Sequence, residues 1–180
     1  MITVVLCGKD HDESINISVE NAVSRYGKIV EKNRDKYREQ QRYEHQFSLY
    51  ECKMVPNLSN RQGIFVFKNS FVCLENKEIP NGFIPIFDSQ NKEAAAVLKG
   101  TGTAAITCGM SPRDTLSIAS LDFLSAIISL QRDIKTVHGT IIEPHEFLVT
   151  LKKEIGVYPL LATCAVLLLS EIPSINGYCF

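Results

Sequence analysis

The sequence shows no excess of charge of either sign. Its 180 residues include 19 lysines and arginines against 20 aspartates and glutamates, which gives a net charge of −1. This balance excludes a strongly basic nucleic-acid-binding protein and an acidic disordered chain as descriptions of the whole sequence. Hydrophobic residues make up 45% of the chain, as in an average globular protein. The chain is long enough to form a core without a metal or a disulfide, and we expect a single domain over residues 1–180.

The first residues do not show the pattern expected of a signal peptide, and the sequence has no long hydrophobic run. Residues 1–8 are apolar but contain no basic residue, and the charged segment that starts at Lys9 follows them directly, so they predict a buried strand. The most apolar stretch, residues 157–169, is about 13 residues long, whereas a membrane-spanning helix needs about 20. We therefore expect a buried helix there and no membrane partner.

The cysteines form no C-x-x-C pair. The six of them are scattered, and most lie inside apolar runs, as Cys108 and Cys164 do. In such surroundings a free cysteine behaves as a small hydrophobic residue. This usage favours a reducing compartment, so we expect a cytoplasmic protein, and it argues against a metal–thiolate site.

The clearest local pattern predicts a strand, a helix and a second strand, at residues 83–87, 92–99 and 103–108. Such a unit places its two strands parallel to each other. We expect Asp88 and Ser89 to cap the helix at its start and Gly100 to end it. Pro85 cannot donate a ladder hydrogen bond, which predicts an edge position or a bulge.

The remaining segments predict an α/β domain. A helix with Ser18 as its N-cap is expected to carry an apolar stripe to about residue 37, and the apolar helix at residues 158–171 should be enclosed. Further strands are expected at residues 3–7, 47–55, 63–74, 114–121, 124–130 and 140–151. The fold class that follows is α/β: a three-layer, mixed, mostly parallel sheet with helices on both faces and an antiparallel extension.

Basic residues gather between residues 25 and 44, where seven lysines and arginines stand among four acidic residues. The sequence permits two interpretations of this stretch, a solvent-exposed helix face with i,i+4 ion pairs or a nucleic-acid-binding arm. The small excess and the interleaved acids favour the first, so we expect no nucleic-acid partner.

Polar side chains follow three of the predicted strands. In an open α/β sheet, ligands bind beyond the carboxyl ends of the parallel strands. Capping explains Asp88 and Ser89 taken alone, and a polar loop explains residues 10–12, but their expected convergence favours a binding site for Mg²⁺, a ribose or a phosphate. The candidate residues are Asp10, His11 and Asp12, then Asp88, Ser89 and Asn91, then Ser111, Arg113 and Asp114.

Taken in order along the chain, these segments resemble the central domain of the Mur ligases. Asp10-His11-Asp12 resembles the Asp-His-x-Asp loop of that family, and residues 28–33 resemble its helical lysine before I-x-E-N. Residues 83–91 are similar to its V-V-N-A-D-D strand and acid pair. Residues 106–109 are similar to its V-x-T-F-G strand, and residues 157–165 to its H-N-x-x-N-x-x-A-A-x-A helix.

Mur ligases use ATP to join an amino acid to a carboxylate through an acyl phosphate. The resemblance implies that His11 is a Mg²⁺ ligand, that Lys28 is a catalytic lysine which bridges to a second metal when carbamylated, and that Asp88 lies near a nucleotide. Mg²⁺ would neutralise the charge that builds on the transferred phosphoryl group. Two departures stand out: the sequence contains no G-x-x-x-x-G-K-[ST] motif, and Ser89 replaces the second Asp of the acid pair.

We therefore expect a Mur-ligase-like domain without independent ligase activity, which binds a nucleotide or small anionic ligand or serves a protein partner. Mg²⁺ and a nucleotide are the cofactors that this expectation implies. Two alternatives stay open. The chain could be a subunit of an ATP-dependent carboxylate–amine ligase whose P-loop comes from another chain. It could also be a structural protein that forms homo-oligomers through the helix after Ser18 and the terminal apolar helix.

Overall fold

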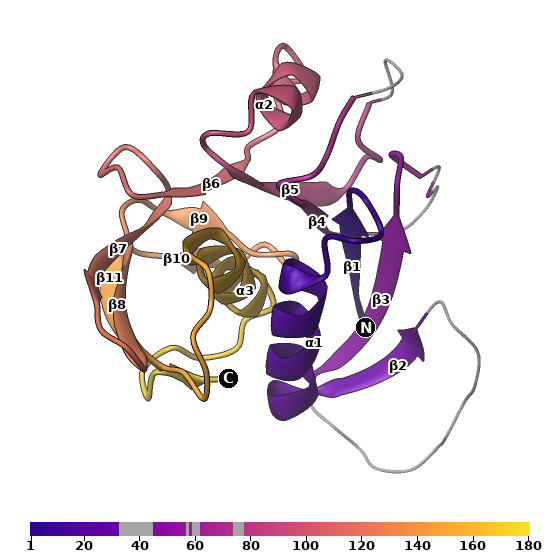
Figure 1. The fold of residues 1–180 in the computed structure, drawn as a ribbon. Helices are drawn as coiled ribbons and strands as arrows, with labels where there is room; N and C mark the ends of the chain where they lie inside the picture. The colour runs from indigo at the N-terminus through magenta and orange to yellow at the C-terminus, as the bar shows by residue number, and fades with distance from the viewer. Residues whose placement is uncertain (33–44, 57, 59–61, 74–77) are drawn as a thin grey trace.

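A ten-stranded sheet with helices on both faces organises the chain, whose computed structural model describes residues 1–32, 45–56, 58, 62–73 and 78–180 (Figure 1). The strands of this sheet are β1 (Ile2–Cys7), β2 (Lys28–Lys32), β3 (Gln46–Cys52), β4 (Gly63–Phe67), β5 (Phe83–Asp88), β6 (Ile106–Gly109), β7 (Leu116–Leu121), β8 (Ser125–Leu130), β11 (His145–Thr150) and β12 (Tyr178–Cys179). The helices are α1 (Ser14–Tyr26), α2 (Lys92–Leu98) and α3 (Val157–Leu169), and a separate two-stranded sheet contains β9 (Ile134–Lys135) and β10 (Ile141–Ile142).

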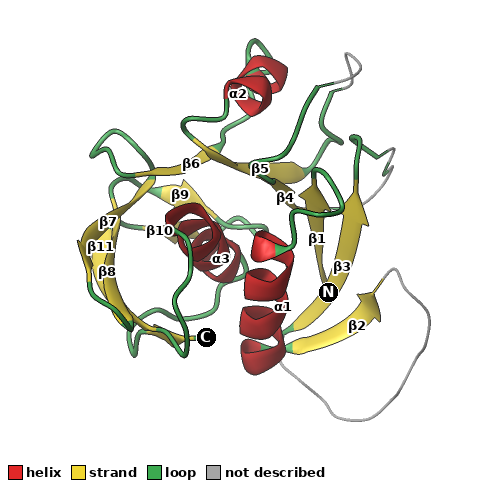
Figure 2. Ribbon diagram, in the orientation of Figure 1, coloured by secondary structure: helices red, strands yellow, loops and turns green. Residues whose placement is uncertain are grey.

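The sheet is mostly parallel. Its strand order is β12-β11-β8-β7-β6-β5-β4-β1-β3-β2, and from β2 to β7 along this order every pair of neighbours is parallel. The pairs β7–β8 and β8–β11 are antiparallel, and these strands curl around α3 (Figure 2). The helices α1 and α3 lie on one face and α2 on the other. The predicted three-layer α/β class, with its antiparallel extension, is confirmed.

The apolar helix α3 forms the centre of the larger core. Every residue from Tyr158 to Leu169 is buried, as the sequence predicted, because α3 packs between the sheet and α1. A buried hydrogen bond of 2.6 Å between the hydroxyls of Ser18 and Thr163 joins the two helices. In the described ranges no helix is both long and apolar enough to span a membrane. The two helices that suggested a homo-oligomer thus pack against each other within one chain, and the homo-oligomer stays a prediction.

The prediction of one helix from Ser18 to about residue 37 is wrong. The helix α1 starts at Ser14 and ends at Tyr26, so Ser18 lies inside it, and residues 28–32 form β2. Gly27 sets the end, because a Cβ there would lie 2.7 Å from the carbonyl oxygen of His45 and equally close to the Phe47 ring. Pairing with β3 then recruits the following residues into the sheet. Residues 33–44, which carry most of the basic stretch, lie outside the described residues.

The predicted strand–helix–strand unit is present as β5, α2 and β6, with β5 and β6 parallel. Gly100 follows the helix with a φ of 83°, as expected for the residue that ends it. The N-cap is Asn91, not Asp88 or Ser89, and its side chain accepts a hydrogen bond from the backbone N–H of Ala94. Pro85 is not on an edge strand, but it precedes the part of β5 that pairs with β6, so β4 is its one ladder neighbour.

Candidate functional site

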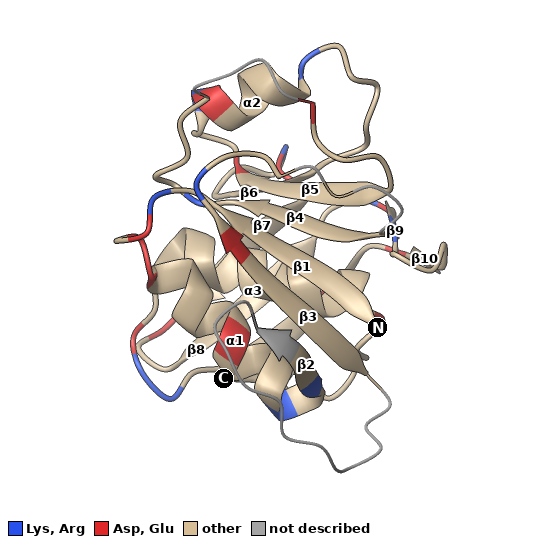
Figure 3. Cartoon of the chain, turned by 90° about the vertical axis from the view of Figure 1, so that its right-hand side faces the viewer, with Lys and Arg blue, Asp and Glu red and all other residues tan. Residues whose placement is uncertain are grey.

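The parallel strands β1, β3, β4, β5 and β6 all end at the same side of the sheet, which we term the carboxyl edge. β1 lies between β3 and β4, so the chain leaves β1 first toward β2 and β3 and later crosses to β4 and β5. A reversal of this kind opens a crevice at the carboxyl ends, where α/β proteins bind ligands. The loops at this edge carry both acidic and basic residues (Figure 3).

Asp12 fastens the loop between β1 and α1 to the segment after β4. Its carboxylate accepts hydrogen bonds from the backbone N–H of Ser70 and from the hydroxyl of Ser14, both at 3.1 Å. The backbone N–H of Lys9 donates in turn to the hydroxyl of Ser70 at 3.0 Å. Burial acts to raise the pKa of Asp12, but the hydrogen bonds from Ser70 and Ser14 and the charge of Lys68 outweigh it and lower this pKa below its ordinary value.

The loop between β5 and α2 is fastened to the same segment. The side-chain N–H of Asn91 donates to the carbonyl oxygen of Lys68 at 3.2 Å, while its oxygen caps α2. Asp88, the last residue of β5, accepts from the backbone N–H of Gln90 at 2.9 Å. The structure therefore places Asp88 and Asn91 at the carboxyl edge, where β4 separates β5 from β1. The segment after β4 forms hydrogen bonds with both the β1–α1 loop and the β5–α2 loop.

At Gly109, the last residue of β6, the backbone lies close to the side chains of Ser89 and Asp114. A Cβ on Gly109 would lie 2.3 Å from a carboxylate oxygen of Asp114 and 2.6 Å from the hydroxyl of Ser89. The buried carboxylate of Asp114 accepts from the backbone N–H of Ser111 at 3.0 Å, and the hydroxyl of Ser111 accepts from the backbone N–H of Arg113 at 3.2 Å. These contacts leave the Arg113 side chain exposed at the same edge.

Asp10 and His11 lie at the exposed tip of the loop between β1 and α1. Asp10 forms an ion pair of 2.6 Å with Lys53, and both side chains are well exposed. Within the described ranges, no three His, Cys, Asp or Glu side chains lie close enough together to hold a metal ion. The role of His11 as a Mg²⁺ ligand remains a prediction.

Lys28 does not join these residues. It opens β2, where it is paired with Gln46, the first residue of β3. Because β2, β3 and β1 are parallel, this position lies at the amino ends of the strands, across the sheet from Asp12 and Asp88. The structure therefore does not bring Lys28 together with Asp10, His11 and Asp88. The expected helix ends before this residue, and the catalytic role that the resemblance implies for Lys28 stays a prediction.

A buried ion pair at the carboxyl edge was missed by the sequence reasoning. The Lys68 side chain is 0% exposed, and its ammonium donates to the Glu51 carboxylate at 2.6 Å. The backbone N–H of Lys68 donates to the carbonyl oxygen of Cys7 at 2.8 Å, and the side-chain N–H of Asn16 donates to Glu51 at 2.6 Å. The sequence gives no signal for this pair, because a lysine directly after the apolar residues 63–67 predicts an exposed side chain.

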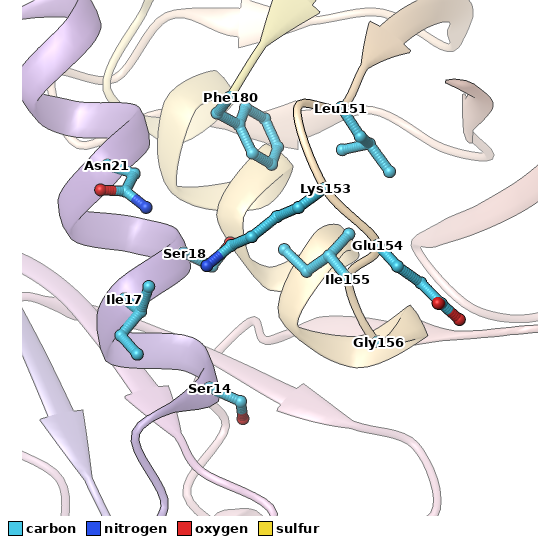
Figure 4. A pocket seen from close by; sticks show the side chains of 10 residues that line it. All are labelled: Ser14, Ile17, Ser18, Asn21, Leu151, Lys153, Glu154, Ile155, Gly156 and Phe180. Atoms are coloured by element: carbon cyan, nitrogen blue, oxygen red, sulfur yellow. The ribbon is translucent and has the colours of Figure 1, made fainter. Parts of the chain in front are cut away.

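Cavities occur at other places in the described part of the chain. One of about 520 Å³ is lined by residues at the amino ends of β4, β5 and β6 and by the segment that contains Lys135. Another of about 190 Å³ lies between α1 and the segment before α3, where Ser14, Lys153 and Phe180 are among its lining residues (Figure 4). Neither cavity is lined by Asp88, Ser89 or Arg113.

The fold is similar to part of two solved structures. This chain is similar to UDP-N-acetylmuramoylalanyl-D-glutamyl-2,6-diaminopimelate–D-alanyl-D-alanyl ligase from Acinetobacter baumannii, with a TM-score of 0.57 and 15% identity over 98% of this chain and 44% of that chain. It has a Mur ligase-like fold. A second structure of MurF from Acinetobacter baumannii gives a TM-score of 0.57 and 14% identity over 97% of this chain and 44% of that chain.

This Mur ligase-like likeness concerns the fold alone, because the sequence identity is low. No family model matches the sequence, and no curated protein matches it. The chain spans less than half the length of the ligase chains. The resemblance predicted from the sequence is thus supported for the architecture, while the roles assigned to His11, Lys28 and Asp88 stay predictions.

Proposed function

We propose that this Mur ligase-like domain binds a nucleotide or another small anionic ligand at the carboxyl edge and has no ligase activity on its own. The observation that carries the proposal is the linkage of loops at that edge. Asp12 accepts a hydrogen bond from Ser70, Asn91 donates one to Lys68, and Ser89 and Asp114 both lie against Gly109. Loops held to one another in this way form a surface before a ligand arrives, which reduces the entropy lost on binding.

The charges at this edge favour an anion bound with Mg²⁺. Most of its carboxylates are already engaged: Asp10 pairs with Lys53, Asp12 accepts from Ser70, and Asp114 accepts from Ser111. The exposed side chains of Lys9 and Arg113 can then contact phosphate oxygens, and Arg is suited to bidentate contacts with phosphate. Oxygen ligands such as Asp88 suit Mg²⁺ bound to a nucleotide.

The loop between β1 and α1 supports the second half of the proposal. In G-x-x-x-x-G-K-[ST] loops, backbone N–H groups and a lysine hold the β- and γ-phosphates. Here the corresponding strand-to-helix loop, residues 8–13, lacks that motif and has no lysine at its end to hold these phosphates. Transfer of the γ-phosphoryl group depends mainly on positioning and charge stabilisation, so we expect no turnover by this chain alone.

Isothermal titration calorimetry with ATP, ADP and UDP-sugars, with and without Mg²⁺, tests the proposal. We expect binding of at least one nucleotide that Mg²⁺ strengthens, and about tenfold weaker binding in Arg113→Ala, since a charged hydrogen bond contributes about 1.5 kcal/mol. Lys135→Ala is the matched control, because Lys135 lines the large cavity at the amino ends of the strands. Absence of binding, or a loss confined to Lys135→Ala, overturns the proposed site.

Gly109→Ala gives an independent perturbation of the same edge. The added methyl group must displace the Asp114 carboxylate and the Ser89 hydroxyl. We expect weaker nucleotide binding in this variant, with circular dichroism used to verify that the fold is kept. Phosphate release from ATP is measured in parallel, and turnover by the chain alone would contradict the absence of independent ligase activity.

A further inference from the structure

Two cysteines face each other at the carboxyl ends of neighbouring strands. Cys7 is the last residue of β1 and Cys52 the last residue of β3, and they are register partners in the parallel ladder. Neighbouring strands lie about 4.8 Å apart, which is inside the range of Cα separations that a disulfide spans. Cys7 belongs to the smaller core cluster on the α2 face of the sheet and Cys52 packs against that cluster, so both side chains lie on the same face. Both are free thiols in this structure.

The surroundings give the two thiols different exposure and shift their pKa values in opposite directions. Cys7 is buried, whereas Cys52 is partly exposed. The hydrogen bond from Cys7 and the positive charge of Lys68 lower the pKa of Cys52, against the effects of burial and of Glu51. The same hydrogen bond, together with burial, raises the pKa of Cys7. Because a thiolate is the nucleophilic form of cysteine, we expect Cys52 to react with an oxidant first and Cys7 to be the neighbouring thiol.

We propose that Cys7 and Cys52 form a peroxide-sensitive dithiol that closes to a disulfide between β1 and β3. The Cys52 thiolate attacks one oxygen of a peroxide, the O–O bond breaks, and the departing hydroxide or alkoxide takes up a proton. The Cys52 sulfenic acid is then attacked by the sulfur of Cys7. The S–S bond forms as the S–O bond breaks, and the thiol proton leaves with the oxygen as water. The two sulfurs together lose two electrons to the peroxide.

The disulfide would act on the candidate binding edge directly. The backbone N–H of Gly8 donates to the carbonyl oxygen of Cys52 at 2.9 Å, so the loop between β1 and α1 begins at this cysteine pair. The backbone N–H of Lys68 donates to the carbonyl oxygen of Cys7 at 2.8 Å. A bond between the two sulfurs therefore joins strands whose ends hold Lys9, Asp12 and the buried ion pair. The proposal does not depend on which ligand binds there.

Hydrogen peroxide treatment of the whole chain, followed by alkylation and peptide mapping, tests the proposal. We expect a mass loss of about 2 Da, the two hydrogens of a disulfide, and a cross-linked pair of peptides that contain Cys7 and Cys52. In Cys7→Ser the sulfenic acid should persist on Cys52 and react with dimedone, while Cys52→Ser should slow oxidation at Cys7 by at least about tenfold. Cys179→Ser is the matched control, since Cys179 is partly exposed on β12.

Two outcomes overturn the proposal. One is an oxidised wild-type protein in which other cysteines react while Cys7 and Cys52 both remain alkylatable. The other is Cys52 oxidation in the wild type that stops at a dimedone-reactive species, which would show that Cys7 does not reach it. Mapping of the wild-type protein decides the pairing even if a serine variant folds poorly.

Discussion

The ion pair between Lys68 and Glu51 predicts an asymmetric response to substitution. The Lys68 side chain is 0% exposed, whereas the Glu51 side chain is 35% exposed, and their charged atoms are 2.6 Å apart. Glu51→Gln leaves a buried ammonium beside a neutral amide. Lys68→Met removes the buried charge and fills a similar volume. The remaining Glu51 carboxylate reaches water and still accepts from Asn16 at 2.6 Å. Glu51→Gln should therefore be the more damaging change.

The expected magnitudes follow from burial. Removing one partner of a fully buried pair costs about 3–5 kcal/mol, and the partial exposure of Glu51 screens part of this, so we expect about 2–3 kcal/mol for Glu51→Gln. For Lys68→Met we expect about 1 kcal/mol, because apolar residues replace buried charges with little loss. The double variant should be more stable than Glu51→Gln alone, since it contains no unpaired ammonium.

Urea unfolding at pH 7, followed by circular dichroism, measures these free energies. Lys53→Met serves as the control, because the pair of Lys53 with Asp10 is 68% and 59% exposed and should contribute less than about 1 kcal/mol. The reasoning fails if Lys68→Met destabilises the protein as much as Glu51→Gln does. It also fails if adding Lys68→Met to Glu51→Gln recovers no stability.

Two further predictions concern Asp12 and Tyr158. The lowered pKa of Asp12 means that its ionised form stabilises the fold above the unfolded pKa of about 4, and that this stabilisation is lost as the pH falls below it. Asp12→Asn should therefore be less stable than wild type at pH 7, with a gap that closes toward pH 3 in thermal melts; a constant gap contradicts the assignment. The buried Tyr158 hydroxyl donates to the carbonyl oxygens of Phe67 and Ile86. Tyr158→Phe should cost about 1–2 kcal/mol, seen as a fall in Tm of roughly 3–6 °C, and an unchanged Tm would contradict it.

Much of the fold was predictable because its signals are local. The composition of the segment from Phe83 to Gly109 predicts a strand, a helix and a second strand. The length of the apolar run at residues 157–169 indicates a buried helix. The end of α1 was not predictable in this way. Residues 28–32 continue a helical apolar pattern in sequence, and their pairing with β3 together with the close approach at Gly27 overrides it. Tertiary contacts decide such boundaries.

In the candidate site too, the residues placed by local patterns were predictable, and those that depend on tertiary contacts were not. Asp12, Asp88 and Asn91 could be assigned to one edge because the parallel order of their strands followed from the local pattern. Two pairs could not be predicted from the sequence, because each depends on which strands are neighbours. These are the ion pair of Lys68 with Glu51 and the pair of Cys7 with Cys52. A lysine after an apolar strand predicts exposure, and only the position of β3 beside β1 explains why this one is buried.

The central place of α3 has a consequence for synthesis of the protein. Ribosomes make β1 and α1 first, yet Val19 and Val23 of α1 belong to the same core as Leu160 and Leu167 of α3. While the last part of the chain is still inside the exit tunnel, these early segments display apolar side chains to the cell. Chaperones that hold nascent chains are therefore expected to engage this polypeptide until α3 has left the exit tunnel.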